Sequence, residues 1–329
     1  MISTNNLFKI KTMKIMLFFS VIITIVKFTA YIITHSNAIL TDALENIINV
    51  VAGAFALFSV YYASLPKDEN HPYGHGKVEF FSVGVEGGLI ILAGGGIIIK
   101  AVMGFFHRVE IEQIDLGLYI TIFGGLANFL MGQYLIKQGK KRSSVLMVAD
   151  GKHLLTDTIS SIGLIIGLGV IYLTKIFWLD NVVAILLGLY ILFAGYKLLK
   201  ESVNNLLDEA DYEKLKDLVL ILNENRNDKW IDMHNLRVLK YGAHLHIDAH
   251  ITLPWYEKLE DSHKEVMAVE RLIQDKLEGE VELFIHADPC LESSCPICII
   301  KDCKERKSAL VTRLDWTMKN LLPDKKHEL

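Results

Sequence analysis

Long apolar segments dominate the first two thirds of the chain, and only short polar stretches separate them. A membrane-spanning helix needs roughly 20 consecutive, mainly apolar residues, because the hydrocarbon core of a bilayer is about 30 Å thick. Six segments meet this requirement: residues 13–33, 38–64, 78–106, 116–136, 144–174 and 182–206. The pattern therefore predicts a transmembrane domain of six helices at residues 1–207.

The last third of the chain has the shorter, more polar pattern of a soluble domain. The order helix, strand, strand, helix, strand predicts a small α+β domain of about 80 residues. We therefore expect a second domain at residues 208–289 and a cysteine-containing tail at residues 290–329. The expected elements are helices at 212–225 and 261–277 and strands at 234–240, 243–253 and 281–286.

Basic residues predict the orientation of the six helices, because short cytoplasmic loops of membrane proteins carry an excess of Lys and Arg. With an even number of spans, both termini and the second domain are then cytoplasmic. A prokaryotic plasma membrane is the simplest expected location, since a transit peptide and a histidine-rich loop are both missing. The basic residues lie before the first segment and between the fourth and fifth: Lys9, Lys11, Lys14, Lys137, Lys140, Lys141 and Arg142.

Composition and charge narrow the class of protein further. The chain is 51% apolar with a mean hydropathy of +0.33, more apolar than an ordinary soluble protein, and its formal net charge is −4. A negative chain lacks the basic footprint of nucleic-acid-binding proteins. The segments contain no His-Glu-x-x-His metalloprotease pattern and no serine or cysteine nucleophile beside a base, so an enzyme is not expected.

Two of the six segments carry polar side chains at bilayer depth, where such groups call for a partner or a function. Glu45 and Asn49 lie four residues apart in the second segment, as His153 and Asp157 do in the fifth. Residues four apart share one helix face, so the two pairs would together make a four-ligand site for zinc, manganese or ferrous iron. Polar contacts between helices are the alternative, and we prefer that interpretation for Glu86, which is isolated in the third segment.

Histidines also gather outside the membrane segments. The loop after the second segment contains Asp68, His71 and His75, which would either hold a more exposed ion or form a polar turn. Along the strand at residues 243–251, alternate side chains point to opposite faces. One face carries three histidines and an aspartate, which favours a metal site over a merely polar sheet surface.

All four cysteines of the chain lie close together, in the pattern Cys290-x4-Cys295-x2-Cys298-x4-Cys303. Four thiolates can satisfy one tetrahedral zinc, and the central Cys-x-x-Cys has the spacing of a zinc knuckle. The first three also match the spacing of a plant-type iron–sulfur protein, although the expected distant fourth ligand is missing. The pattern favours a structural or sensing zinc, with unligated thiols and an iron–sulfur cluster as alternatives.

Three of these stretches together resemble the cation diffusion facilitator family. They are residues 36–49, the His-Pro-Tyr-Gly-His-Gly-Lys loop at 71–77, and residues 149–157 with their His-x-x-x-Asp. The resemblance extends from the first segment to about Asp288. It implies a homodimer of six-helix protomers, each with a cytoplasmic ferredoxin-like domain, that exports a divalent metal, usually zinc, in exchange for protons.

The resemblance implies a transport site at Glu45, Asn49, His153 and Asp157. Zinc-carrying members usually have His or Asp at the position of Glu45 and Asp at the position of Asn49, so this sequence departs from their pattern. Because an asparagine side chain carries no charge, manganese, iron or a broad divalent specificity become alternatives. The order of affinities among divalent ions still favours zinc.

The resemblance implies three further features in the loop and the cytoplasmic domain. His244 and His246 do not correspond to family ligands, and we expect them at the surface. The features are a loop site of Asp68, His71 and His75, a dimer charge interlock between Lys77 and Asp208, and a pair of zinc ions near the dimer interface held by His234, His250, His263, His286 and Asp288.

Together these patterns predict a divalent transition-metal efflux transporter, with zinc as the first expectation, that works as a homodimer by alternating access. Metal would be the substrate and also a structural or regulatory ligand of the cytoplasmic domain. Entering metal would displace protons from His153 and from Asp157 or Glu45, and histidine suits this exchange because it titrates near neutral pH. The alternative is a membrane-anchored metal-binding or regulatory protein without transport.

Overall fold

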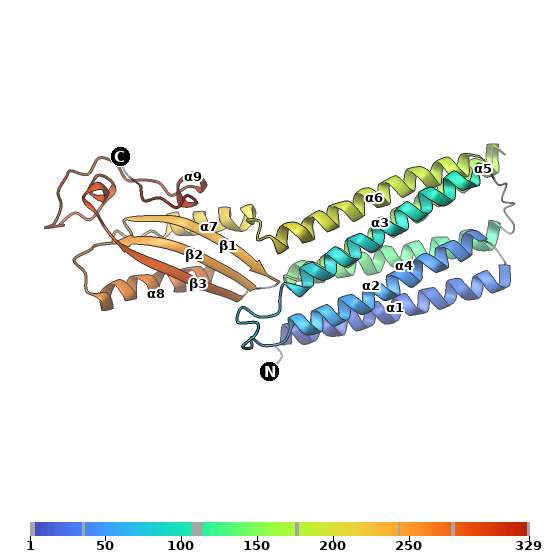
Figure 1. Cartoon of the computed structure of the whole chain (residues 1–329), viewed down its shortest axis with the longest axis horizontal. Helices are drawn as coiled ribbons and strands as arrows, with labels where there is room; N and C mark the ends of the chain where they lie inside the picture. The colour runs from blue at the N-terminus through green and yellow to red at the C-terminus, as the bar shows by residue number, and fades with distance from the viewer. Residues whose placement is uncertain are drawn as a thin grey trace. The chain divides into compact units, whose positions relative to one another are not determined.

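The computed structural model describes residues 4–34, 37–106, 114–174, 178–242, 244–277 and 280–327. The chain divides into two compact units, Met1–Leu207 (unit 1) and Asp208–Leu329 (unit 2). The boundary coincides with the change from long apolar segments to short alternating elements in the sequence. The described elements of unit 1 are helices, whereas unit 2 combines helices with a sheet (Figure 1).

Unit 1 contains one long helix for each predicted segment, and α1 packs with α2, α3 with α6, and α4 with α5 (Figure 1). Among the described residues, three helical stretches are long and apolar enough to cross a membrane: Thr4–Thr29, Val78–Gly104 and Asn181–Leu206. The six helices are α1 (Thr4–Thr34), α2 (Asn37–Ala63), α3 (Val78–Gly104), α4 (Ile114–Lys141), α5 (Val145–Thr174) and α6 (Leu179–Leu206).

Glycines permit the closest helix contacts in unit 1. A Cβ atom on Gly87 of α3 would come within 2.8 Å of the backbone nitrogen of Leu199 in α6. One on Gly151 of α5 would come within 2.8 Å of the carbonyl oxygen of Gly132 in α4. Such small residues let helix backbones approach closely in a membrane bundle. Gly151 lies two residues before His153, so this contact fixes the part of α5 that carries the candidate ligands.

Unit 2 is built on a three-stranded sheet in the order β1-β2-β3. β1 and β2 pair antiparallel and β2 and β3 pair parallel, so β2 is the central strand. The predicted order of helix, strand, strand, helix, strand is confirmed. The elements are α7 (Tyr212–Glu224), β1 (Asp232–Tyr241), β2 (His244–Leu253), α8 (Leu259–Lys276) and β3 (Glu280–Pro289).

The core of unit 2 lies between one face of this sheet and the apolar faces of its helices. On β2, every second residue from Leu245 to Ile251 is buried in the core, while α7 contributes Leu218 and Leu222 and α8 contributes Val269. Burying a side chain of this size contributes roughly 1.5–3 kcal/mol. Because neighbouring residues of a strand point to opposite faces, the histidines of β2 lie on the other side of the sheet.

The tail after β3 packs onto the same unit. Trp316 and Leu321 are buried in the core described above. The guanidinium of Arg226 donates to the carbonyl oxygens of Ile231 and Leu314, and it lies 4.4 Å from the centroid of the Trp316 ring. The tail contains the 3₁₀-helix η1 (Glu292–Ile297) and the short helix α9 (Met318–Leu321).

Candidate metal sites

Three of the four predicted transport ligands meet between α2 and α5. Asn49 of α2 donates from Nδ2 to Asp157 Oδ2 at 3.0 Å, and its Oδ1 lies 2.9 Å from His153 Nε2. His153 and Asp157 lie one turn apart on α5, with Nδ1 and Oδ1 3.6 Å from each other. An amide, an imidazole and a carboxylate thus contact one another inside the helical unit.

The hydrogen bonds of Asn49 determine how the other two side chains are used. Because its amide hydrogens point to Asp157, its carbonyl oxygen accepts, and His153 therefore donates from Nε2. His153 Nδ1 is buried and has no hydrogen-bond partner within the described part of the chain. That nitrogen faces the carboxylate of Asp157. The lone pair of His153 Nδ1 and the oxygen Oδ1 of Asp157 therefore converge on the space between the two side chains.

Glu45, Lys77 and Asp208 remain predictions. Glu45 lies in α2 one turn before Asn49, but its side chain is outside the described residues. Lys77 precedes α3 in unit 1, whereas Asp208 begins unit 2. Neither the fourth transport ligand nor the Lys77–Asp208 interlock is therefore part of the described geometry.

A buried pair of acids lies beside these ligands. Glu86 of α3 and Asp150 of α5 are 4% and 2% exposed, and their carboxyl groups are close enough to interact electrostatically. Among the described residues, no donor reaches either Glu86 oxygen or Oδ2 of Asp150. Glu86 is thus a contact between helices, as its position indicated, but it is not isolated: its partner is another acid.

The loop between α2 and α3 brings Asp68, His71 and His75 together, with one ligand atom of each within 4.8 Å of the others. Asp68 Oδ1 lies 3.0 Å from His71 Nδ1, and Oδ2 lies 3.3 Å from His75 Nε2. Gly74, at φ 92°, permits the turn between the histidines. Desolvation raises the pKa of Asp68, but hydrogen bonds from His71 outweigh it and hold this pKa below its usual value. The geometry suits a cation at the surface.

Strand register aligns three histidines across the sheet of unit 2. His234 of β1 pairs with His250 of β2, which in turn pairs with His286 of β3. Asp288 Oδ2 lies 3.2 Å from His250 Nδ1 and 3.6 Å from His234 Nε2, so these three residues form a compact group, the sheet group. His286 Nε2 lies 3.7 Å from Asp288 Oδ1, while His263 is exposed on α8 outside the group.

The surroundings of His234 prepare it to bind a metal ion. Burial lowers its pKa, although the carboxylates of Asp232 and Asp288 act in the opposite direction. The imidazole is therefore neutral at physiological pH, which is the form that binds metal. A β-bulge between His234 and Arg237, with Asn235 at φ 53°, interrupts the pairing of β1 next to the site. Bulges of this kind re-aim the side chains beside them.

The end of the chain contacts the sheet group, which no sequence spacing indicated. Asp232, 1% exposed, accepts from the backbone N–H of His327 at 2.9 Å, and its Oδ1 lies 2.7 Å from His327 Nδ1. Its Oδ2 lies 4.0 Å from His234 Nδ1. Lys326 Nζ lies 3.6 Å from Asp288 Oδ1. The buried carboxylate of Asp232 and the ammonium group of Lys326 therefore lie next to the candidate ligands of the sheet group.

His246 differs from its predicted surface position. It is only 8% exposed, its ring lies 4.8 Å from that of Tyr241, and its Nδ1 lies 3.3 Å from Glu282 Oε2. Because β2 is the central strand, residues of β1 and β3 cover His246 from both sides. His244, at the start of the strand, is partly exposed.

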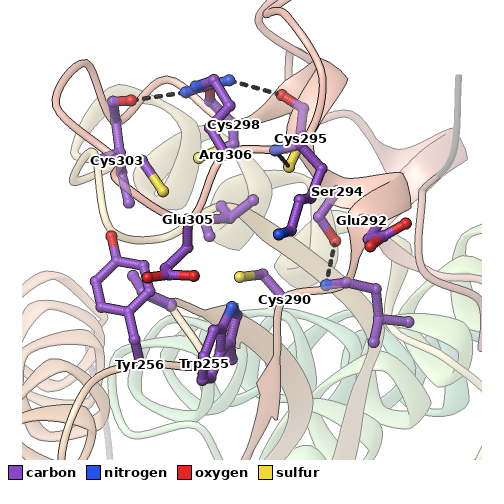
Figure 2. A pocket seen from close by; sticks show the side chains of 15 residues that line it. Trp255, Tyr256, Cys290, Glu292, Ser294, Cys295, Cys298, Cys303, Glu305 and Arg306 are labelled. Atoms are coloured by element: carbon purple, nitrogen blue, oxygen red, sulfur yellow. Dashed lines mark hydrogen bonds between the residues drawn. The ribbon is translucent and has the colours of Figure 1, made fainter.

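The remaining predicted ligands are the cysteines. Cys290, Cys295, Cys298 and Cys303 line a single cavity of about 300 Å³ in unit 2 (Figure 2). None of them forms a disulfide. The close spacing in sequence is therefore matched by closeness in space.

Comparison with known proteins agrees with the two-unit architecture. The family description "cation efflux transmembrane domain" matches residues 13–207, and "cation efflux protein, cytoplasmic domain" matches residues 207–290. The two matches meet at the boundary between the units. Unit 1 is thus a helical transmembrane domain and unit 2 a cytoplasmic domain.

Individual relatives align over most of the chain. An uncharacterized transporter of Synechocystis is 30% identical over 263 residues, which cover 80% of this chain and 84% of its own length. Metal tolerance protein C1 of Arabidopsis thaliana is 29% identical over 282 residues, covering 79% of this chain and 58% of its own. The manganese efflux system protein MneP of Bacillus subtilis is 23% identical over 268 residues, covering 79% and 89%. With both units matched, the chain belongs to the cation efflux family, the cation diffusion facilitators, which are transporters of divalent metal cations and not enzymes.

Proposed function

We propose that this chain exports a divalent transition-metal ion, zinc before manganese or iron, in exchange for protons. Divalent metal efflux follows from membership of the family. The observation that supports the finer proposal is the meeting of Asn49, His153 and Asp157 between two helices of the transmembrane domain. Nitrogen and oxygen ligands at bilayer depth mark the path of an ion.

The ligand types favour zinc without excluding harder ions. An imidazole nitrogen and a carboxylate suit zinc, whose affinity for such sites exceeds that of manganese and ferrous iron. The uncharged amide oxygen of Asn49 suits manganese and iron as well. Among the relatives are a manganese efflux protein of Bacillus subtilis and the cation-efflux pump FieF of Salmonella typhi. Manganese is therefore the nearest competitor for the site.

Proton exchange is supported by the position of His153 Nδ1. A proton on this nitrogen would lie between the imidazole and the carboxylate of Asp157, whose Oδ1 is 3.6 Å away. A metal ion at the same place would take both groups as ligands and displace that proton. An exchanger requires a position that binds either a proton or a metal ion. Alternating access would then carry the metal ion and the proton across the membrane in opposite directions.

We propose further that the protein acts as a homodimer in a prokaryotic plasma membrane with both termini in the cytoplasm. The match to the cytoplasmic domain of cation efflux proteins supports the dimer. Lys140 and Lys141 in the last turn of α4 support the orientation, because basic residues favour the cytoplasmic side. Metal bound to the sheet group would then report the cytoplasmic concentration of the ion.

Metal uptake by proteoliposomes of the purified full-length protein tests the proposal, comparing zinc, manganese, ferrous iron and cadmium. Asp157→Asn keeps the shape of the side chain and removes its charge, so zinc uptake should fall on the order of 10–100-fold. Asp217→Asn, at an exposed position of α7, is the matched control and should transport normally. Zinc binding without uptake by the wild type would support the membrane-anchored binding protein instead. Faster uptake of manganese or iron would overturn zinc as the preferred ion.

A further inference from the structure

The four cysteines surround the cavity of unit 2 from different elements. Cys290 directly follows β3, Cys295 lies in η1, Cys298 follows η1, and Cys303 lies in the next loop. Figure 2 shows their side chains around the cavity, with Cys290 across from the other three. The fold thus brings together every thiol of the chain, without joining any of them in a disulfide.

A backbone hydrogen-bond donor points at one of the sulfur atoms. A neutral thiol is a weak acceptor and gains little from such bonds, whereas N–H groups aimed at sulfur are a regular feature of metal–thiolate sites and tune their potentials. The bond runs from the Lys307 N–H to Cys295 Sγ and is 3.4 Å long.

Arg306 closes the loop around the cavity. Its guanidinium donates to the carbonyl oxygens of Cys295 at 3.0 Å, Cys298 at 3.0 Å and Ile300 at 2.7 Å. These bonds fix the backbone that carries two of the four sulfurs. The guanidinium also places a permanent positive charge beside the cysteines, which would offset the net negative charge of four metal-bound thiolates.

The separation of the sulfurs distinguishes a single ion from a cluster. Tetrahedral zinc binds thiolates at about 2.3 Å, which places its four sulfurs about 3.8 Å apart. Among the described residues, which include all four cysteines, no three of these sulfurs lie within 4.8 Å of one another, unlike the ligand atoms of the loop site and the sheet group. In a [4Fe–4S] cluster each thiolate binds a different iron, so the sulfurs are spread around the cluster. The cavity between these sulfurs fits that arrangement.

Free thiols are the remaining interpretation. Cys298 is buried, and Cys290, Cys295 and Cys303 are partly buried. Buried thiols react slowly. A thiol-based redox switch is therefore poorly supported, because it needs an accessible thiolate.

From these observations we propose that Cys290, Cys295, Cys298 and Cys303 bind a [4Fe–4S] cluster. The cluster would join the segment after β3 to the turn that carries Trp255 and, through the small apolar cluster around Cys298, to Ile231 at the start of β1. This site does not depend on the proposed transport, because it uses no ligand of the transmembrane domain.

Iron and sulfide analysis of the full-length protein, purified without oxygen, tests the proposal. We expect about four iron and four acid-labile sulfide per chain, and a visible absorption band that a reductant bleaches. Cys298→Ser and Cys303→Ser should lose iron and sulfide together, whereas Asp217→Asn, at an exposed position of α7, should keep both. Iron bound as cargo would come without sulfide and so would be distinguished from a cluster.

Reconstitution covers the case in which the cluster is lost during purification. The metal-free protein is incubated either with ferrous iron and sulfide or with zinc alone, and each product is analysed. Formation of one cluster per chain would support the proposal. One zinc per chain bound by the cysteines without sulfide, or four reactive thiols that take up no metal under either condition, would overturn it.

Discussion

Asn49 links the other two described residues of the transport site. One amide gives its hydrogens to Asp157 and accepts from His153, so it orients both side chains at once. It is also, with Glu45, one of two positions at which the sequence departs from the zinc-carrying pattern. At the scale of the single residue, we therefore expect the choice of ion to depend on this side chain.

The replacement Asn49→Asp should tighten zinc binding during transport. A second carboxylate beside Asp157 adds charge at a ligand position without changing the shape of the side chain. The zinc concentration for half-maximal uptake by proteoliposomes should fall on the order of 10–100-fold, and it should rise in Asn49→Ala, the matched loss of the amide. Equal values for wild type and both variants would show that Asn49 is not a ligand.

The acid pair next to the site makes a separate prediction about stability. In Glu86→Gln, the new amide can donate to Asp150, whose Oδ2 has no donor among the described residues. A satisfied hydrogen bond contributes about 1 kcal/mol, so the variant should unfold at a higher temperature than the wild type in detergent. Glu86→Ala, which offers no donor, is the control and should show no gain. A lower unfolding temperature for Glu86→Gln would contradict the assigned pairing.

Among the elements, α7 depends on the residue that precedes its first turn. Asp211 caps this helix by accepting from the N–H groups of Glu213 and Lys214, and it lies 2.5 Å from Lys240 of β1. Desolvation raises the pKa of Asp211, but the interactions with Lys240, Lys214 and Glu213 outweigh it and hold this pKa below its usual value. The folded pKa is depressed, so this stabilisation is present above the unfolded pKa, about 3.9, and is lost as pH falls through the lower folded value.

Removing this cap should loosen α7 at neutral pH. Asp211→Ala is expected to cost about 1 kcal/mol, which corresponds to roughly five-fold faster hydrogen exchange in the helix. Mass spectrometry of the exchanged protein at pH 7 measures the effect, with Asp217→Asn on the exposed face of α7 as control. The difference should shrink as pH falls below about 4 and vanish below the lower folded pKa of Asp211, where the carboxyl is protonated in both states. Unchanged exchange in Asp211→Ala would show that the cap does not hold the helix.

The tail places a cation beside the sheet group, where we expect it to compete with a metal ion. Lys326 Nζ lies 3.6 Å from Asp288 Oδ1 and is partly exposed, so its pairing is modest. Lys326→Gln should therefore strengthen zinc binding there by about two- to five-fold. Zinc binding at the sheet group is identified as the binding step that is lost in His250→Ala. Lys325→Gln, at the neighbouring exposed residue, is the control. Weaker binding in Lys326→Gln would mean that the tail supports the site.

Helix positions were predictable from the sequence, and so was part of the site. The spacing of four residues placed His153 and Asp157 on one face of α5, because helix geometry alone decides that relation. The contact of Asn49 with both of them depends on how α2 packs against α5, which no local spacing determines. The sequence singled out Glu86 as an ionisable residue in an apolar segment. It could not indicate the partner of Glu86, because Asp150 lies on another helix.

The sheet group shows the same limit in unit 2. Alternation along β2 indicated that His250 points away from the core, but the register that sets His234 beside it also depends on the bulge at Asn235. The contact between Asp232 and His327 joins residues 95 positions apart. Cysteine spacing likewise left zinc and an iron–sulfur cluster open, because it does not determine how far apart the sulfurs lie.

At the scale of the whole molecule, a transmembrane domain with candidate transport ligands is joined to a cytoplasmic domain with candidate metal ligands of its own. We propose that the first domain transports the ion and that the second senses it. Loading of the sheet group should bring the two cytoplasmic domains of the dimer closer. A dimer spacing that did not respond to metal would remove the sensing role and leave transport unaffected.

The most direct test of the account is zinc uptake by proteoliposomes under an imposed pH gradient, with internal zinc and internal pH followed together. We expect an acidic interior to accelerate zinc entry, the interior to become more alkaline as zinc accumulates, and Asp157→Asn to slow both changes on the order of 10–100-fold. Zinc entry at the same rate with and without the gradient, and without any change of internal pH, would contradict metal-for-proton exchange at Asn49, His153 and Asp157.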